Sequence, residues 1–222
     1  AAGSVTLDTT VASADISTSA AGDVDIDETD AIVLTDVDTS DGAVTVDAGG
    51  QITATDVDSS ATDDDSNDIT LTSTGAGIEA QLVVAGSSND VTLDAQGGAI
   101  TENGDAGADV VGDVLTADAA GSVTLDTTVA SADISTSAAG DVDIDETDAI
   151  VLTDVDTSDG AVTVDAGGQI TATDVDSSNT DADANDVNLT TTAGNISVGS
   201  VDAGSAGDAT LNAAANITDD GS

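Results

Sequence analysis

The sequence predicts an all-β fold, a parallel β-solenoid of about ten coils of about 19–25 residues each, with one longer coil. Apolar and polar residues alternate in short segments, such as residues 5–8 and 24–27, with the period of a half-buried strand. These segments return about every twenty residues, and Gly, Asn, Asp and Ser, which favour turns, lie between them. A coil this short cannot bury its apolar face alone, so neighbouring coils have to stack.

A long repeat encloses the short one. Residues 1–60 recur unchanged as residues 119–178, an offset of 118. The 222 residues are therefore expected to form a single solenoid, with a long repeat at 1–118 and a partial second repeat at 119–222. The alternating strand of each coil is expected to begin at Val5, Val24, Val44, Ile69, Val91, Val123, Val142, Val162, Val187 and Ala209. The wide gap after Val91 predicts an insertion near residues 106–114 or an additional partial turn.

Two other states share parts of this pattern. Acidic chains without aromatic residues are commonly disordered, and short strands joined by turns also build sandwiches or tandem small β-domains. However, 39% of the residues are hydrophobic, and the β-branched residues that favour strands are plentiful. A sandwich also gives no reason for equivalent strands to return at this spacing. The solenoid is the favoured fold, with a narrow core of Val, Ile, Leu and Ala.

The composition excludes several classes of function. The chain has 45 Asp and Glu, no Lys, Arg or His, and no Cys, so its formal charge is −45. Nucleic-acid binding is excluded because phosphate contacts need cationic side chains. Disulfides and thiolate metal sites are excluded, and the apolar runs are too short for membrane insertion. Most acid–base and nucleophilic catalysis lacks the residues that it requires, so we do not expect an enzyme.

Stacking is expected to align the outward aspartates of successive coils. With Val5 and Leu7 facing inward, Asp8 faces outward and begins a column of acidic residues. Two like charges about 5 Å apart repel by about 1 kcal/mol in water. Such columns need side chains splayed into solvent, screening by salt, or cations that bridge the coils. The columns predicted to bind metal are those of Asp36, Asp38, Asp56 and Asp58, and of Asp154, Asp156, Asp174 and Asp176.

The densest acidic segment is expected in a loop. Alternating oxygen ligands there resemble the first half of an EF-hand loop, but the sixth position is Asp and the twelfth is Thr74 or Thr192. Because Ca²⁺ accepts six to eight oxygens in a flexible geometry, it is the predicted cofactor. A solvated acidic loop is the alternative. The predicted ligands are Asp63, Asp65, Asn67 and Asp68, with Asp181, Asp183, Asn185 and Asp186 in the second repeat.

Three short motifs carry a resemblance to a known family. Gly-Asp-Val-x-(Ile/Leu)-Asp at residues 22–27 is followed by Gly-Gly-x-Ile-Thr at 49–53 and Asp-Val-Asp at 56–58. This order resembles the repeats of filamentous-haemagglutinin-like adhesins and related β-strand-repeat proteins, which are very large secreted bacterial surface proteins. The resemblance covers nearly the whole chain. It implies a right-handed parallel β-helix, an extracellular location at the cell surface, and a role as a shaft or adhesive fibre.

The expected function is structural. We expect a non-catalytic segment of an extracellular bacterial fibre or adhesin stalk that is stabilised by Ca²⁺. Its expected partners are divalent cations and further copies of itself or continuing repeats, without nucleic acid or membrane insertion. An Asp-rich component of a surface layer that binds mineral or ions is the alternative. A carbohydrate-active β-helix enzyme is a distant one, because the aromatic and basic residues that such enzymes use are absent.

Overall fold

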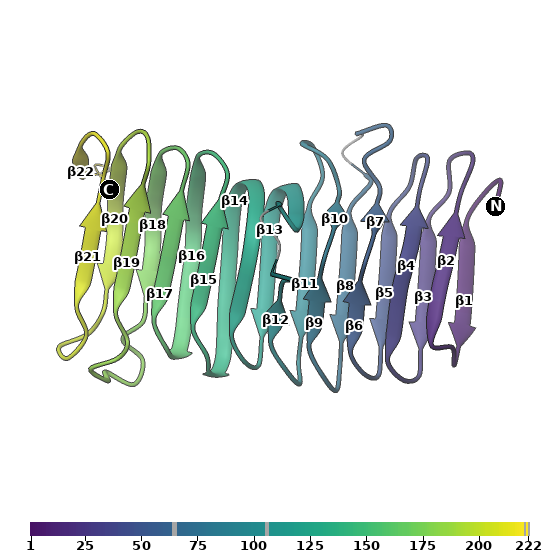
Figure 1. Ribbon diagram of the computed structural model, residues 1–222, viewed down its shortest axis with the longest axis horizontal. Coiled ribbons are helices and arrows are strands. Elements are labelled where there is room, and N and C mark those ends of the chain that lie inside the picture. Colours follow the sequence, from purple (N-terminus) through teal and green to yellow (C-terminus); the bar gives the residue numbers. More distant parts are fainter. Residues whose placement is uncertain (64–65, 105–106, 220, 222) are drawn as a thin grey trace.

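The computed structural model describes residues 1–63, 66–104, 107–219 and 221, and in these the chain forms only strands, turns and bends. The strand pairings are parallel and join the strands into one 22-stranded sheet. The strands follow one another along the long axis, with the two termini at opposite ends (Figure 1). This arrangement confirms the predicted parallel β-solenoid of about ten coils. Its right-handed sense stays a prediction.

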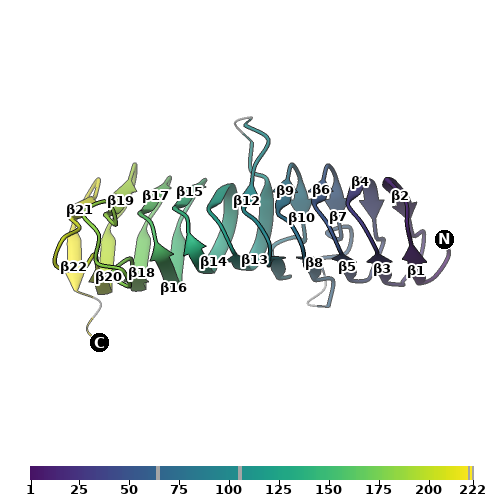
Figure 2. The ribbon, with the colours of Figure 1, turned by 90° about the horizontal axis from the view of Figure 1, so that it is seen from below.

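The strands form two ladders, seen as a lower and an upper row in Figure 2. The first ladder begins with β1 (Val5–Thr9), β3 (Val24–Glu28), β5 (Val44–Ala48), β8 (Ile69–Ser73) and β11 (Val91–Ala95). It continues with the second halves of β13 (Val110–Ala119) and β14 (Val123–Ala139), then β16 (Ile150–Asp159), β18 (Ile170–Asp176), β20 (Ile196–Asp202) and β22 (Ile217–Asp219).

The second ladder begins with β2 (Ser13–Ser17), β4 (Ile32–Asp38), β6 (Ile52–Ala54) with β7 (Val57–Asp58), β9 (Ile78–Ala80) with β10 (Val83–Val84), and β12 (Ile100–Thr101). It continues with the start of β13, the first half of β14, β15 (Val142–Glu146), β17 (Val162–Ala166), β19 (Val187–Thr191) and β21 (Ala209–Asn212). The predicted second and third short strands of a coil are therefore separate in some coils and one continuous strand in others.

The core follows from the alternation in sequence. Val5 pairs with Val24 and Val24 with Val44, so equivalent aliphatic residues lie directly above one another, as predicted. Along β3, Val24 and Ile26 are buried while Asp25 and Asp27 are exposed. Fully buried Val, Ile, Leu and Ala continue through all but the terminal coils. Because burying each Val, Ile or Leu contributes about 1.5–3 kcal/mol, this narrow core holds the coils together without an aromatic residue.

Glycines allow the turns of adjacent coils to approach closely. A Cβ added at Gly167 would lie 1.9 Å from the Thr147 carbonyl oxygen, and one at Gly49 would lie 2.1 Å from that of Thr29. These positions are equivalent in the two long repeats. Glycine is therefore required where the backbone of one turn rests on the backbone of the next.

The junction between the long repeats differs from the prediction. Val123 was expected above Val91, but Val91 pairs with Leu115 and Val123 pairs with Ile100 of the other ladder. The reason is an additional strand segment, residues 115–119, which has the same alternation as the strand beneath it and stacks on it. The predicted alternative of an additional partial turn is confirmed. The described residues between β12 and β13 also leave the row of strands (Figure 2).

The additional segment moves the second long repeat to the opposite ladder. Residues 5–9 lie in the first ladder, whereas their identical copy, residues 123–127, lies in the second. One long repeat of 118 residues therefore spans about five and a half turns. Equivalent strands of the two copies therefore lie on opposite sides of the solenoid.

Candidate metal centre

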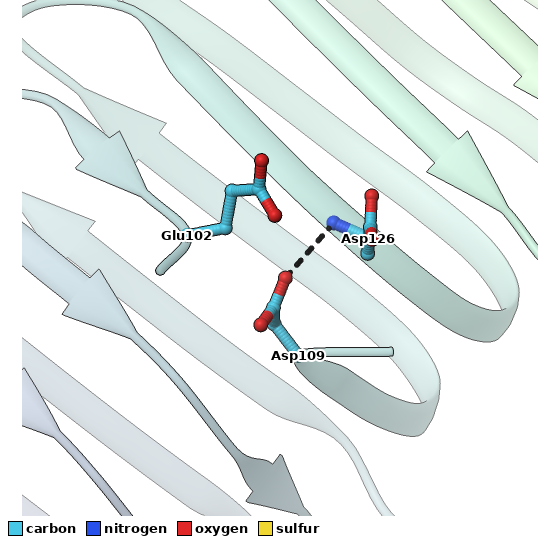
Figure 3. Close-up of side chains that lie close together, drawn as sticks. All are labelled: Glu102, Asp109 and Asp126. Carbon is cyan, nitrogen blue, oxygen red and sulfur yellow. Dashed lines mark hydrogen bonds between the residues drawn. The ribbon is translucent and has the colours of Figure 1, made fainter. Parts of the chain in front are cut away.

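Three carboxylates meet at the junction between the repeats (Figure 3). One carboxylate oxygen each of Glu102, Asp109 and Asp126 lies within 4.8 Å of the others. Glu102 follows β12, Asp109 precedes β13, and Asp126 lies in the first half of β14. The cluster therefore joins the two ends of the projecting connection to the first strand of the second repeat.

The strand register brings these residues together. Thr101 pairs with Glu79, so Glu102 follows at the level of the inward-facing Ala80. Val110 pairs with Val83, which returns Asp109 to the same ladder. Asp126 belongs to the strand that stacks on β12 through the pair Ile100–Val123. An acidic residue at an inward position is unfavourable in a continuous strand, and β12 ends immediately before Glu102.

Backbone hydrogen bonds fix two of the three residues. The Asp126 amide donates to Oδ2 of Asp109 at 3.2 Å, and the Asp109 amide donates to the Asp126 carbonyl oxygen at 2.7 Å. Asp109 is buried, and Glu102 and Asp126 are half-buried. The Oε2 atom of Glu102 is shielded from solvent and accepts no hydrogen bond from the residues that the structure describes. Three carboxylates without a cationic neighbour present the hard oxygen ligands that a metal ion such as Ca²⁺ or Mg²⁺ takes.

An acidic groove continues from the cluster across the second repeat. Asp126 pairs with Asp145, and Asp145 with Asp165. All three line an open groove with Gly107 and Ala108. The first repeat has an equivalent groove lined by Asp8, Asp27 and Asp47, on the other ladder. The predicted columns of outward aspartates therefore exist, but they do not form one continuous column along the rod.

Two predicted ligands of the acidic loops hold neighbouring coils together. The Asp63 carboxylate accepts hydrogen bonds from the Ser87 hydroxyl at 2.9 Å and the Ser88 amide at 3.0 Å. In the second repeat, Asp181 accepts from the hydroxyl and amide of Ser205 and from the Ala206 amide. These bonds, first the one from the Ser205 hydroxyl, lower the pKa of Asp181. Both aspartates adopt the left-handed backbone conformation, with φ of 44° and 48°.

The other loop residues have related roles. Asp68 accepts from the Asp90 amide and Asp186 from the Asp208 amide. Asn67 and Asn185 are buried, and their side-chain amides donate to Thr62 and Thr180, respectively. Asp183 is exposed, and Asp65 lies outside the described residues. The carboxylates of four loop residues accept hydrogen bonds from the next coil, and in the described part of these loops no three carboxylates converge on one point; the four are Asp63, Asp68, Asp181 and Asp186.

The other predicted columns are in register as well. Asp38 pairs with Asp58 and Asp156 with Asp176, while Asp154 pairs with Asp133 and Asp174 with Ser200. Burial and then the charge of neighbouring aspartates raise the pKa of Asp38, Asp56 and Asp156. Asp36, next to Asp38, is one of these neighbours. The predicted repulsion between like charges is therefore the second cause of these raised pKa values, after burial.

Of the described acidic residues, only Glu102, Asp109 and Asp126 bring three carboxylate oxygens this close together. None of the three was among the predicted metal ligands, and metal binding at those ligands stays a prediction. Sequence reasoning missed the cluster because it placed Val123 above Val91. Had Val123 been aligned with Ile100, Glu102 and Asp109 would have been found at the two ends of the insertion, beside Asp126.

Comparisons with protein families, curated proteins and solved structures gave no match to this chain. A search of the described residues for a helix long and apolar enough to cross a membrane also found none.

Proposed function

We propose that this chain is a non-catalytic stretch of the shaft of an extracellular bacterial fibre or adhesin stalk. One observation carries the proposal: a single parallel sheet and a single aliphatic core run through about ten coils along the rod. Each coil rests only on its neighbours, so such a rod can be lengthened without a change in design. This architecture suits a spacer between a cell surface and whatever the fibre contacts.

The composition supports an extracellular location. Without Lys or Arg, the chain offers no cleavage site to trypsin-like proteases, and without Phe, Tyr or Trp it lacks the aromatic sites that chymotrypsin-like proteases prefer. The resemblance of its motifs to those of filamentous-haemagglutinin-like adhesins points the same way. Immunogold electron microscopy of intact producing cells tests this part of the proposal. We expect gold particles on material outside the cell envelope, whereas label confined to the cell interior would contradict an extracellular fibre.

We further propose that Ca²⁺ binds Glu102, Asp109 and Asp126 and stabilises the junction of the two repeats. The ion would neutralise carboxylates from both ends of the projecting connection and from β14, and so tie the connection to the rod. A ligand present at 100 times its dissociation constant stabilises a folded protein by about 2.7 kcal/mol. For a domain of this size, that corresponds to a rise in thermal midpoint of roughly 5–10 °C.

Thermal unfolding followed by circular dichroism, in EGTA and then in excess Ca²⁺, tests this site. We expect Ca²⁺ to raise the midpoint of the wild type, and Asp126→Asn to lose most of that rise. Asp8→Asn is the matched control, because Asp8 is the copy of Asp126 in the first repeat, where Glu102 and Asp109 are not nearby. Equal responses of both variants, or no response of the wild type, would rule out calcium binding here.

The aligned aspartates favour a second candidate, an Asp-rich component of a surface layer that binds ions. Asp8, Asp27 and Asp47 stand in register in one groove, and Asp126, Asp145 and Asp165 in the other. Equilibrium dialysis with Ca²⁺ separates the two candidates. About one tightly bound ion per chain supports a shaft stabilised at its junction, whereas many weakly bound ions along the grooves support an ion-binding layer.

A further inference from the structure

The dipeptide Asn103-Gly104 is the only Asn-Gly pair in the chain. Asparagine is among the chemically labile residues, because the backbone nitrogen of the next residue can attack the carbon of its side-chain amide. Glycine in the next position favours this attack, since it has no Cβ to crowd the approach and its backbone rotates freely. Whether the attack occurs in a folded protein depends on how the fold holds the two residues.

The structure leaves this pair in an open position. The strand β12 ends at Thr101, and both Asn103 and Gly104 are exposed. A Cβ added at Gly104 would meet no atom within 4 Å beyond its chain neighbours, and the Gly104 amide donates no hydrogen bond to a described residue. Gly104 also lies in the left-handed region, with a φ of 84°. The nitrogen that would attack Asn103 is therefore accessible and is not held by strand pairing.

Asparagines in other coils are held differently. Asn89 is buried, and the amide that follows it, that of Asp90, donates to the carboxylate of Asp68 at 2.9 Å. The Ile196 amide, which follows Asn195, donates at 2.9 Å to a carbonyl oxygen of the next coil. In both places the nitrogen that would have to attack the side chain is already bonded within the ladder or turn.

We propose that Asn103 is a site of spontaneous modification, at which its side-chain amide is converted to a carboxylate. The Gly104 nitrogen gives its proton to water and bonds to Cγ of Asn103. The bond from Cγ to Nδ2 breaks, and Nδ2 takes up a proton and leaves as ammonia, so that a succinimide ring forms. Water then opens the ring at one of its two carbonyls and leaves an aspartate or an isoaspartate. Either product consumes one water, releases one ammonia and adds one negative charge.

The new charge would arise beside the candidate metal centre. Asn103 directly follows Glu102, of which one carboxylate oxygen lies within 4.8 Å of those of Asp109 and Asp126. A negative charge this near a divalent cation strengthens its binding by about threefold to tenfold at low salt. The modification would therefore strengthen the binding of Ca²⁺ at the junction as the protein ages. This last step rests on the calcium site proposed above, whereas the modification itself does not.

Mass spectrometry of incubated protein tests the modification. A protease that cleaves after Glu releases residues 103–146, in which Asn103 is the only Asn and no Gln occurs, and residues 80–102, which contain the buried Asn89. After incubation of the folded wild type in mildly alkaline buffer, the first peptide should gain the mass difference between an amide and a carboxyl group. Asn89 should react at least about tenfold more slowly. Equal rates, or no mass gain in residues 103–146, would overturn the proposal.

Two variants separate the succinimide route from direct hydrolysis of the amide. Asn103→Gln should lose the mass gain, because the longer side chain would have to close a larger and less favourable ring. Gly104→Ala should slow the gain, because its methyl group crowds the nitrogen and disfavours a φ of 84°. Circular dichroism checks that both variants fold. Rates equal to that of the wild type in both variants would exclude the attack by Gly104.

Calorimetric titration with Ca²⁺ tests the link to the metal centre. Asn103→Asp mimics the product, and Asn103→Gln is the matched neutral control. At low salt, Asn103→Asp should bind Ca²⁺ about threefold to tenfold more tightly than Asn103→Gln, and the difference should shrink at high salt. Equal affinities would refute the link. If neither variant binds Ca²⁺, the proposed metal centre fails, and the rate of the mass gain still decides whether Asn103 is modified.

Discussion

At the scale of single residues, the pKa values of two identical carboxyls are shifted in opposite directions in the two repeats. Glu28 and Glu146 are copies of one another, both 4% exposed, and each accepts hydrogen bonds from a threonine hydroxyl and two backbone amides. The bond from Thr9 lowers the pKa of Glu28, whereas burial raises the pKa of Glu146. Glu28 has one coil beneath it and Glu146 has the whole first repeat, so more protein surrounds Glu146.

Aspartates of the outward columns also have raised pKa values. Burial, followed by the charges of Asp145 and Asp165, raises the pKa of Asp143 above 3.8. Burial and neighbouring aspartates raise the pKa of Asp133 in the same way. A carboxyl with a raised pKa in the folded state binds protons more readily there than in the unfolded chain. Its contribution to stability is therefore full below pH 3.8 and is lost as the pH rises through its folded pKa.

We predict that Asp143→Asn stabilises the protein at neutral pH and has little effect near pH 3. Removing one like charge from a cross-strand column should contribute about 0.2–1 kcal/mol. Asp181→Asn is the control of opposite sign. Hydrogen bonds lower the pKa of Asp181, so the Asp181 carboxylate stabilises the folded protein at neutral pH, and this contribution is lost as the pH falls. Urea unfolding at the two pH values measures both. Destabilisation by Asp143→Asn at neutral pH would contradict the assignment.

At the scale of strands, identical sequences form different elements. Residues 5–9 and 13–17 form two strands, β1 and β2, whereas the matching residues of the second repeat lie in one long strand, β14. Within the described residues β1 and β2 pair with strands on one side, whereas β14 pairs with strands on both sides. In this coil, pairing on both sides accompanies one continuous strand.

This contrast gives a prediction in which one substitution is made twice. Leu125→Ala should destabilise the protein by about 2–5 kcal/mol, because it leaves a cavity in a closed core. Leu7→Ala should cost about 1 kcal/mol or less, because Leu7 is already partly exposed. Urea unfolding of the two variants measures the difference. Equal losses would mean that the first coil is covered in solution.

At the scale of the whole molecule, the half turn between the repeats is the main structural feature. It places the groove of Asp8, Asp27 and Asp47 on one ladder and its copy on the other, so like charges do not form one continuous column along the rod. The same half turn creates the cluster of Glu102, Asp109 and Asp126.

The sequence by itself determined the strands, their inward residues and the stacking of Val5, Val24 and Val44, because the alternation of apolar and polar residues is local and recurs in each coil. Only the tertiary structure decided the partners across the junction. Residues 115–119 stack on β11 and take up half a turn, which moves Val123 onto Ile100 and Asp126 beside Glu102. Which strand a chain pairs with after an insertion depends on how the insertion packs, and strand periodicity carries no information about that.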